Sequence, residues 1–261
     1  MRNYCTAGDE YRVRRLRLIA PLFVVVLFIA MTLGCGHHGS PDPLPGMPRL
    51  VLWAWERPEH LEYIVPSATG VAYLAGTVSL ARSEVQAQPR LQPLFVPDRT
   101  PVIAVIRIET DSGRLAPVRE VSKAIAGLAA RTGLRAVQID FDARRSQRQY
   151  YRDLITQLRR EIPDKLPLEM TALVSWCRDD NWINGLEVAE AVPMFFRMGM
   201  DPHATTEHLR EPLCLSSFGI STDEFYVTVP HVRRVFVFSS QRWTETSYRA
   251  VLEASKQWFA N

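Results

Sequence analysis

The stretch that decides the fold is VQIDFD, at residues 137–142. Side chains alternate along a strand, so Gln138, Asp140 and Asp142 share one face and the apolar residues between them share the other. Burying two carboxylates together is costly unless they are paired or hydrogen-bonded. The pattern therefore predicts a strand with an apolar face against helices and a polar face toward a barrel axis. Proximity of the two acids is expected to raise the pKa of one of them, as an acid catalyst requires.

Outward from this stretch, the chain repeats one pattern: an apolar, β-rich run, a turn, usually a helical segment, and the next run. Eight runs are predicted to be strands, at residues 50–55, 71–76, 102–108, 136–141, 168–176, 191–197, 215–219 and 234–239. Strands that alternate with helices indicate an α/β protein with a parallel sheet. Eight units in roughly 210 residues predict a small (β/α)8 barrel of the TIM type, as one domain over residues 49–261. An open doubly wound sheet is the alternative.

The early part of this barrel is expected to be irregular. Residues 79–99 have little helical periodicity, and three prolines lie within them. A loop or an extra hairpin is therefore predicted there.

The N-terminus has the features of an export signal. A basic cluster at residues 12–17 precedes 16 uncharged residues at 18–33, and Cys35 follows the tetrapeptide MTLG. This order predicts a bacterial lipoprotein signal peptide over residues 1–34, with Cys35 lipidated, and a flexible Pro- and Gly-rich tether over residues 35–48. An uncleaved membrane anchor is the alternative, although ~20 apolar residues are needed to span a bilayer. Gly36, rather than Asp, resembles Gram-negative lipoproteins of the outer membrane, so we expect a protein held at that membrane and facing the periplasm.

Composition and charge narrow the functional classes. The chain has 261 residues, of which 47% are hydrophobic, and its formal net charge is +3. Residues 1–34 hold five Arg and two acidic residues, and their removal leaves 26 basic and 26 acidic residues. No nucleic-acid partner is therefore predicted. Cys177 and Cys214 fall at opposite ends of their predicted strands, which indicates two buried thiols rather than a disulfide.

Polar and aromatic residues gather at the carboxyl ends of the predicted strands, where barrels of this type place their active sites. The catalytic candidates are Asp140, Asp142 and Glu109. The candidates for substrate binding are Trp53, Trp55, Arg57, Arg107, Gln138, Trp176, Arg197 and Gln241. Aromatic rings beside hydrogen-bonding groups suit a sugar. The alternative is that the acids and arginines neutralise one another as a structural ion network. No motif for a metal or a cofactor accompanies them, and neither is predicted.

Four blocks carry a family resemblance: WAWERPEHL at 53–61, VQIDFDARRSQRQYY at 137–151, LEMTALVSWC at 168–177 and PMFFRMG at 193–199. Together they resemble the bacterial domain-of-unknown-function family numbered 3142, which includes putative lipoproteins. The resemblance implies a fold but no reaction.

A weaker similarity is to the family 18, chitinase-like glycoside hydrolases. Strand four of those enzymes ends in Asp-x-Asp-x-Glu, with Glu as the general acid. One register places Asp142 at the acid position, and the other places Arg144 there, so neither register supplies the Glu.

Two functional hypotheses follow. The first is an envelope-anchored glycoside hydrolase, in which Asp142 is the general acid, Asp140 tunes its pKa and Glu109 is the second carboxylate. Sugar rings would stack on Trp53, Trp55 and Trp176. The second is a non-catalytic binding or scaffold lipoprotein, in which arginine side chains hold acidic groups of a glycan or another envelope ligand.

Overall fold

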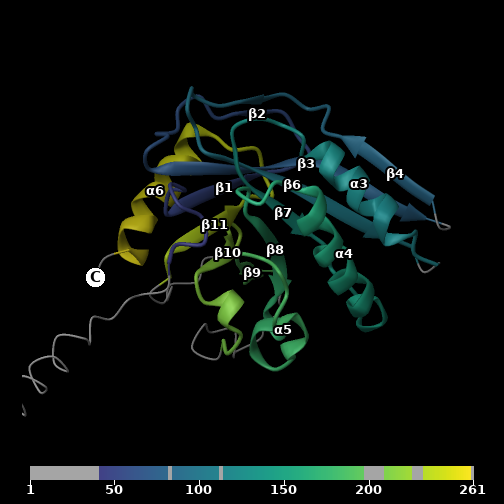
Figure 1. Cartoon of the computed structure of the whole chain (residues 1–261). Coiled ribbons are helices and arrows are strands. Elements are labelled where there is room, and N and C mark those ends of the chain that lie inside the picture. Colours follow the sequence, from purple (N-terminus) through teal and green to yellow (C-terminus); the bar gives the residue numbers. More distant parts are fainter. Residues whose placement is uncertain (1–40, 82–83, 112–113, 197–208, 225–231, 260–261) are drawn as a thin grey trace, which may run out of the picture. The chain divides into compact units, whose positions relative to one another are not determined.

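The computed structural model describes residues 41–81, 84–111, 114–196, 209–224 and 232–259, and one compact unit spans Asp42–Asn261. Eight parallel strands form a closed barrel (Figure 1). They are β1 (Leu50–Ala54), β3 (Thr69–Ala81), β6 (Val102–Thr110), β7 (Leu134–Asp140), β8 (Leu168–Leu173), β9 (Ala191–Met194), β10 (Ser217–Ser221) and β11 (Arg234–Phe238). The strands pair in chain order, and the barrel closes because β1 pairs with both β3 and β11. The predicted TIM-like barrel is confirmed, and the doubly wound alternative is wrong.

The irregularity predicted for the early barrel is an extra hairpin. β3 is the longest of the eight, and β4 (Glu84–Pro89) pairs with its second half antiparallel. Two very short strands, β2 (Glu59–His60) and β5 (Leu94–Phe95), form a separate parallel pair. No helix is present between β1 and β6 in the part of this region that the structure describes.

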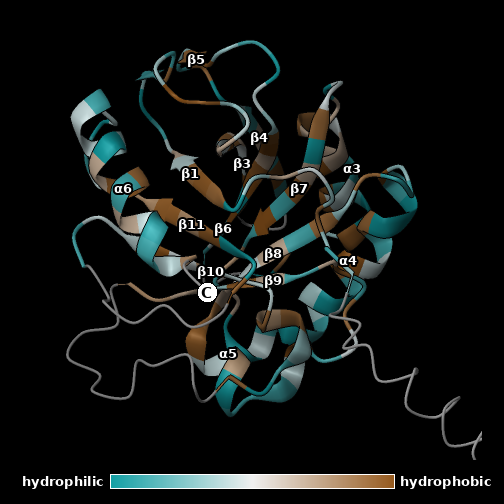
Figure 2. Cartoon of the chain, turned by 90° about the vertical axis from the view of Figure 1, so that its left-hand side faces the viewer, coloured by the Kyte–Doolittle hydropathy of each residue, from teal (hydrophilic) through white to brown (hydrophobic). Residues whose placement is uncertain are grey.

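Three amphipathic helices cover the outside of the barrel: α3 (Val118–Leu128), α4 (Arg148–Glu161) and α6 (Glu245–Trp258). The apolar strands lie behind helices whose outer faces are hydrophilic (Figure 2). The helix α6 begins at Thr244, whose hydroxyl accepts a hydrogen bond from the Ser247 amide at 3.1 Å. Three short 3-10 turns complete the described elements: η1 (Arg145–Gln147), η2 (Asn181–Ile183) and η4 (Pro212–Cys214). Among the described helices, none has the length and apolar character that crossing a membrane requires.

Residues 42–48 close the amino-terminal end of the barrel. Leu44 and Met47 are buried there against apolar side chains from the first residues of the strands. Arg234 of β11 fixes this segment, since its guanidinium donates hydrogen bonds to the Asp42 carboxylate at 3.0 Å and to the Pro48 carbonyl at 3.2 Å. The chain therefore enters the barrel at the end opposite to the carboxyl ends of its strands.

A set of buried polar side chains lies just above this closure, and we call it the floor network. It consists of Gln138, Glu169, Glu190, Ser217 and Arg234. Gln138 Nε2 donates to Glu169 Oε1 at 3.2 Å, and Arg234 Nη1 lies 3.3 Å from Glu190 Oε1. Burial, with the neighbouring Glu190, raises the pKa of Glu169 well above its usual range. Burial also raises the pKa of Glu190, although the Arg234 guanidinium and the Ser217 hydroxyl oppose that rise.

The expectation of two free thiols is wrong, because Cys177 and Cys214 form a disulfide with Cα atoms 5.9 Å apart. The run at 168–176 is not one strand. It breaks after Leu173, and α5 (Val174–Arg178) packs against β8 and β9. This helix brings Cys177 to the turn η4 that precedes β10, where the Arg210 amide also donates to the Cys177 carbonyl at 2.8 Å.

Candidate functional site

A cavity of about 730 Å³ opens at the carboxyl ends of the barrel strands, and we call it the mouth cavity. One part of its lining is aromatic or aliphatic, and the other is charged or hydroxylated. The lining residues are Trp53, Trp55, Arg57, Arg107, Asp140, Asp142, Thr171, Leu173, Val174, Ser175, Arg178, Met194, Phe196, Phe238 and Ser240. Its volume is within the range of sites that enclose a small organic ligand.

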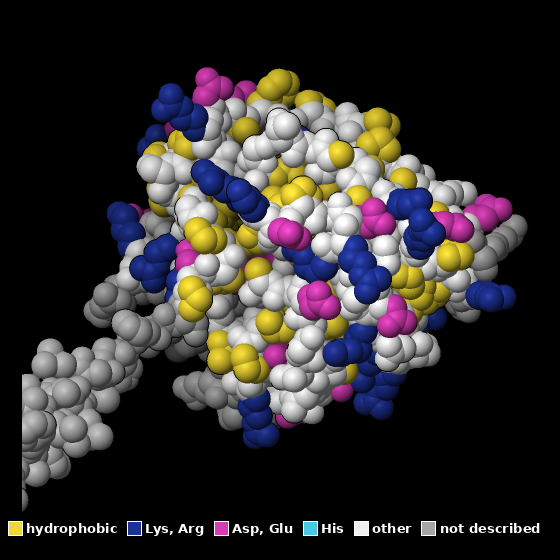
Figure 3. Space-filling model, in the orientation of Figure 1, with side chains coloured by type: hydrophobic (Ala, Val, Ile, Leu, Met, Phe, Trp, Pro, Cys, Tyr) yellow, Lys and Arg dark blue, Asp and Glu magenta, His cyan; other side chains and the backbone are white. Residues whose placement is uncertain are grey.

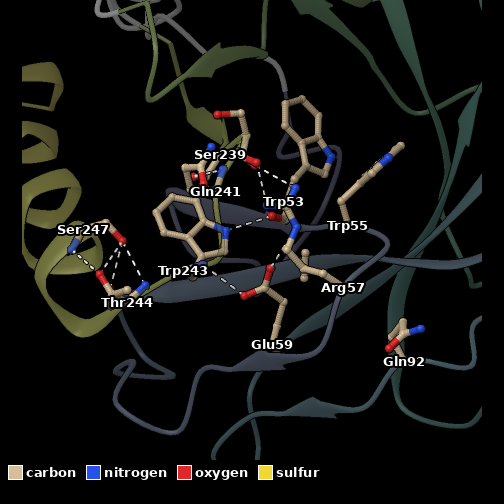
Figure 4. Close-up of polar contacts among 12 residues, drawn as sticks. Trp53, Trp55, Arg57, Glu59, Gln92, Ser239, Gln241, Trp243, Thr244 and Ser247 are labelled. Carbon is tan, nitrogen blue, oxygen red and sulfur yellow. Dashed lines mark hydrogen bonds and ion pairs between the residues drawn. The ribbon is translucent and has the colours of Figure 1, made fainter.

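The end of β1 supplies three of these residues, and buried contacts hold it in place (Figure 4). Trp243, on the connection from β11 to α6, donates its ring N–H to the Trp53 carbonyl at 2.9 Å. Its backbone N–H donates to the Glu59 carboxylate at 3.1 Å. Arg57 in turn donates to the Ser240 carbonyl at 2.6 Å. The strand end is thereby fixed to the last connection of the barrel.

A second clamp on this segment comes from Arg90, which follows β4. Its guanidinium donates to the backbone carbonyls of Trp55 and Arg57, the latter at 2.6 Å. Its Nε donates to the Gln92 carbonyl at 2.8 Å. Arg90 directly follows the extra hairpin. The hairpin therefore helps to position Trp55 and Arg57, which line the mouth cavity.

Aromatic side chains pack together along one wall of the cavity. The rings of Phe196 and Phe238 are stacked with centroids 5.6 Å apart. Trp55 meets Phe238 edge-on at 6.2 Å, and Trp53 meets Phe196 edge-on at 6.1 Å. These contacts fix the ring orientations, so the wall is a preformed surface for stacking.

Asp140 and Asp142 lie on the opposite, polar part of the lining. Asp140, the last residue of β7, accepts a hydrogen bond from the Thr171 hydroxyl at 2.8 Å. Burial, reinforced by the charges of Asp142 and Glu109, raises the pKa of Asp140 to about 6, although Thr171 and Arg107 oppose the rise. Burial also raises the pKa of Asp142, against the attraction of Arg107. Asp140 is therefore a group that takes up and releases a proton near neutral pH.

The charge of Arg107 lowers the pKa of both Asp140 and Asp142, and Arg107 also interacts with other acids. Its Nε lies 3.2 Å from Glu109 Oε1, and its Nη1 lies 3.9 Å from Glu56 Oε1. Its guanidinium carbon also lies 6.0 Å from the centre of the Trp55 ring. Arg107 thus connects the aromatic and the acidic parts of the mouth.

The structure brings six of the predicted site residues to the mouth cavity: Trp53, Trp55, Arg57, Arg107, Asp140 and Asp142. Glu109 lies outside it, paired with Arg107. Gln138 lies below it in the floor network, where it accepts a hydrogen bond from the Trp53 ring at 2.9 Å. Trp176 is buried on α5 against Trp182.

The other two predicted residues have different outcomes. Gln241 is exposed and does not line the cavity, because the interior positions of the last strand are the even-numbered ones, Phe238 and Ser240. Arg197 lies outside the described residues.

Sequence reasoning missed the side chains that β8, β9 and α5 contribute. Thr171 and Leu173 are interior positions two apart on β8, and Phe196 lies two residues after Met194. The same alternation that indicated Asp140 and Asp142 would have identified them. Ser175 and Arg178 carried no such signal, because Ser175 was predicted to be strand and Arg178 lay beyond the predicted strand, whereas both lie on α5.

Within the described residues, no group of three or more His, Cys, Asp or Glu side chains is arranged to hold a metal ion.

The fold and the cavity define a small TIM-type barrel with an open site that is aromatic on one side and acidic on the other. Residues 98–204, about two fifths of the chain, match the family model for a domain of unknown function, DUF3142. The predicted resemblance to this family is confirmed over that stretch, which contains the 137–151, 168–177 and 193–199 blocks in full. No curated protein and no solved structure matched the chain.

Proposed function

We propose that this protein acts on a glycan at the mouth cavity, as a glycoside hydrolase. The single observation that carries the proposal is the aromatic wall of the cavity, which faces a pair of carboxyl groups whose pKa values burial raises. Aromatic rings stack on the apolar faces of sugars, and glycosidic bonds are cleaved by paired carboxyl groups in different protonation states.

The pKa values favour Asp140 as the proton donor. Its Oδ1 accepts the Thr171 hydroxyl, which leaves Oδ2 to carry the proton when Asp140 is protonated. In the reaction, Asp140 protonates the leaving oxygen as the glycosidic bond breaks. Asp142 takes a proton from the water that forms the new bond to the anomeric carbon. The sequence analysis gave the acid role to Asp142 instead. The residue that acts as the acid is the one whose Asn variant loses most activity on substrates with poor leaving groups.

The test is the release of reducing ends from peptidoglycan, chitin-type oligomers and exopolysaccharides by the purified protein. We expect release by the wild type and its loss, by about 10²-fold or more, in Asp140→Asn and Asp142→Asn. Asp164→Asn is a matched control, because this exposed residue lies in the loop before β8, at the other end of the barrel. Activity that survives in both mouth variants would contradict the proposal.

The second candidate is a non-catalytic glycan-binding protein. The position of Glu109 favours it, since the acid that the sequence indicated as the second carboxylate pairs with Arg107 outside the cavity. Binding without release of reducing ends, weakened by Trp55→Ala, would support this alternative.

We also propose that the chain is exported, lipidated at Cys35 and anchored to the bacterial envelope. The Cys177–Cys214 disulfide supports this location, because such bonds persist in oxidising compartments. Entry of the chain at Asp42, at the closed end of the barrel, would leave the mouth open when the tether is anchored. Cys35→Ser should move the protein from the membrane to the soluble fraction of a Gram-negative host. Unchanged membrane association would contradict lipidation.

A further inference from the structure

The charges of the mouth are unbalanced in one direction. Around the single guanidinium of Arg107 lie four carboxyl groups, those of Glu56, Glu109, Asp140 and Asp142. On the face seen in Figure 3, by contrast, acidic and basic side chains are interspersed. Only Asp140 and Asp142 of these line the cavity, while Glu56 and Glu109 pair with Arg107 beside it, so the acidic side of the mouth holds more carboxyl groups than cations.

The other two arginines of the lining do not offset this excess. Arg57 donates to the carbonyls of Ser239 and Ser240 and lies 3.7 Å from the buried Glu59. Arg178 lies 3.9 Å from Asp179 and is largely buried. Both cations are thus engaged at the edge of the cavity, whereas the Asp142 carboxylate has no hydrogen-bond partner among the described residues.

We infer that the glycan bound at the mouth carries a positively charged amino group, so that its class is a polymer or oligomer containing de-N-acetylated hexosamine units. This inference rests on the proposed glycan function. An ammonium group on the sugar would donate to Asp142 and Asp140, while the ring stacks on the aromatic wall. Charge-assisted hydrogen bonds of this kind are stronger than neutral ones.

The other ligand charges fit less well. A uronate would add another negative charge beside Asp140 and Asp142, the two carboxyl groups of the lining. A neutral sugar would displace water from Asp140 and Asp142 without compensating their charge, which is costly. A metal ion has no matching set of ligands in the described part of the chain. An amino sugar can stack its apolar face on the aromatic wall and donate hydrogen bonds from its ammonium group to Asp140 and Asp142.

The experiment compares three pentamers that share the β-1,4 linkage and differ at the C2 substituent: glucose, N-acetylglucosamine and glucosamine. Binding to the purified protein is measured by calorimetry at neutral pH, at low and raised salt. We expect the glucosamine pentamer to bind roughly 10- to 100-fold more tightly than the other two at low salt. We expect raised salt to reduce that preference.

Two variants then show which carboxylate of the protein binds the ammonium group. Asp142→Asn should reduce the preference to about threefold or less, because the ammonium group loses its charged acceptor. Asp164→Asn, which removes the same charge at the closed end, should change neither value.

Three outcomes would overturn the inference. The first is tighter or equal binding of the glucose or the N-acetylglucosamine pentamer, which leaves the proposed glycan function intact. The second is equal competition by spermidine, which would show that the mouth selects charge without a sugar. The third is no binding of any pentamer, accompanied by no release from the wider glycan panel, in which case the proposed function fails as well.

Discussion

The two ends of the same barrel use the same residue types in opposite ways. In the floor network, Glu190 and Arg234 are buried and paired at 3.3 Å, and Glu169 is hydrogen-bonded to Gln138. At the mouth, Asp142 and Arg107 face a cavity of about 730 Å³. Carboxyl groups whose partners lie within the protein contribute to folding. Carboxyl groups that face a cavity lower the stability of the fold, but they are available to bind a ligand.

The largest expected effect lies in the floor network. Arg234→Met retains much of the side-chain volume but leaves the buried Glu190 without its cation, so we expect a loss of about 3–5 kcal/mol in the free energy of unfolding. Urea denaturation measures it. Arg249→Met on the exposed side of α6, where Arg249 pairs with Glu245, should cost about 0.5 kcal/mol or less. A loss below about 1 kcal/mol in Arg234→Met would show that the floor network is not a structural element.

The next effect concerns the disulfide that supports one wall of the mouth. Replacing Cys177 and Cys214 together by Ala removes a crosslink across 37 positions, which should lower the free energy of unfolding by about 3–4 kcal/mol. Ligand affinity should fall too, because α5 carries Ser175 and Arg178. A reductant should produce the same loss in the wild type and none in the double variant. Unchanged stability in both would contradict a structural role for the bond.

The disulfide also shows where sequence reasoning reached its limit. Strand number, strand order and barrel closure were predictable, because each apolar run has its own turn and helix signals. The run at 168–176 contains no glycine or proline that would end a strand, so nothing local indicated that Val174 starts a helix. Tertiary packing of α5 against β8 and β9 overrides the local propensity there. With the helix unseen, the distance between Cys177 and Cys214 was overestimated.

The residues of the candidate site were predictable where the alternation of side chains along a strand alone determines which of them point into the barrel. Trp53, Trp55 and Asp140 lie at interior positions that follow from the period of two. The distinction between Asp140 at the mouth and Gln138 in the floor network did not follow, because depth along the axis depends on which partners the neighbouring strands supply. Arg90 was also unpredictable, since its role depends on backbone carbonyls of a distant segment.

A third prediction uses the cost of leaving Asp140 open to the cavity. Its pKa is raised from 3.8 to about 6. The unfolded chain therefore releases this proton at lower pH than the folded protein does, and stability is lost as pH rises between about 4 and 6. Asp140→Asn should remain close to wild type at pH 4 and become more stable, by about 1–3 kcal/mol, above pH 6.

Thermal unfolding of wild type and Asp140→Asn across this pH range measures the difference. Asn retains an acceptor for the Thr171 hydroxyl, so the loss of this 2.8 Å hydrogen bond does not contribute to the difference in stability. Asp164→Asn should give no pH-dependent difference. A variant that is less stable than wild type at all pH values would show that ionised Asp140 is stabilised by its neighbours, as in the floor network.

The smallest effect on stability is expected at Arg90, and it distinguishes positioning from folding. Arg90→Gln removes donors to the Trp55 and Arg57 carbonyls beside the open mouth, where water can replace them, so the free energy of unfolding should fall by only about 1 kcal/mol. Ligand affinity should fall severalfold, because Trp55 and Arg57 lose their fixed placement. Hydrogen exchange of the backbone amides of residues 55–57 should quicken while those of β7 stay protected. Arg119→Gln, on the exposed side of α3, should change none of these quantities. Arg90→Gln would lower stability as much as Arg234→Met does only if the hydrogen bonds of Arg90 contribute to folding, as those of the floor network do. That result would contradict the difference between the two ends of the barrel at β1.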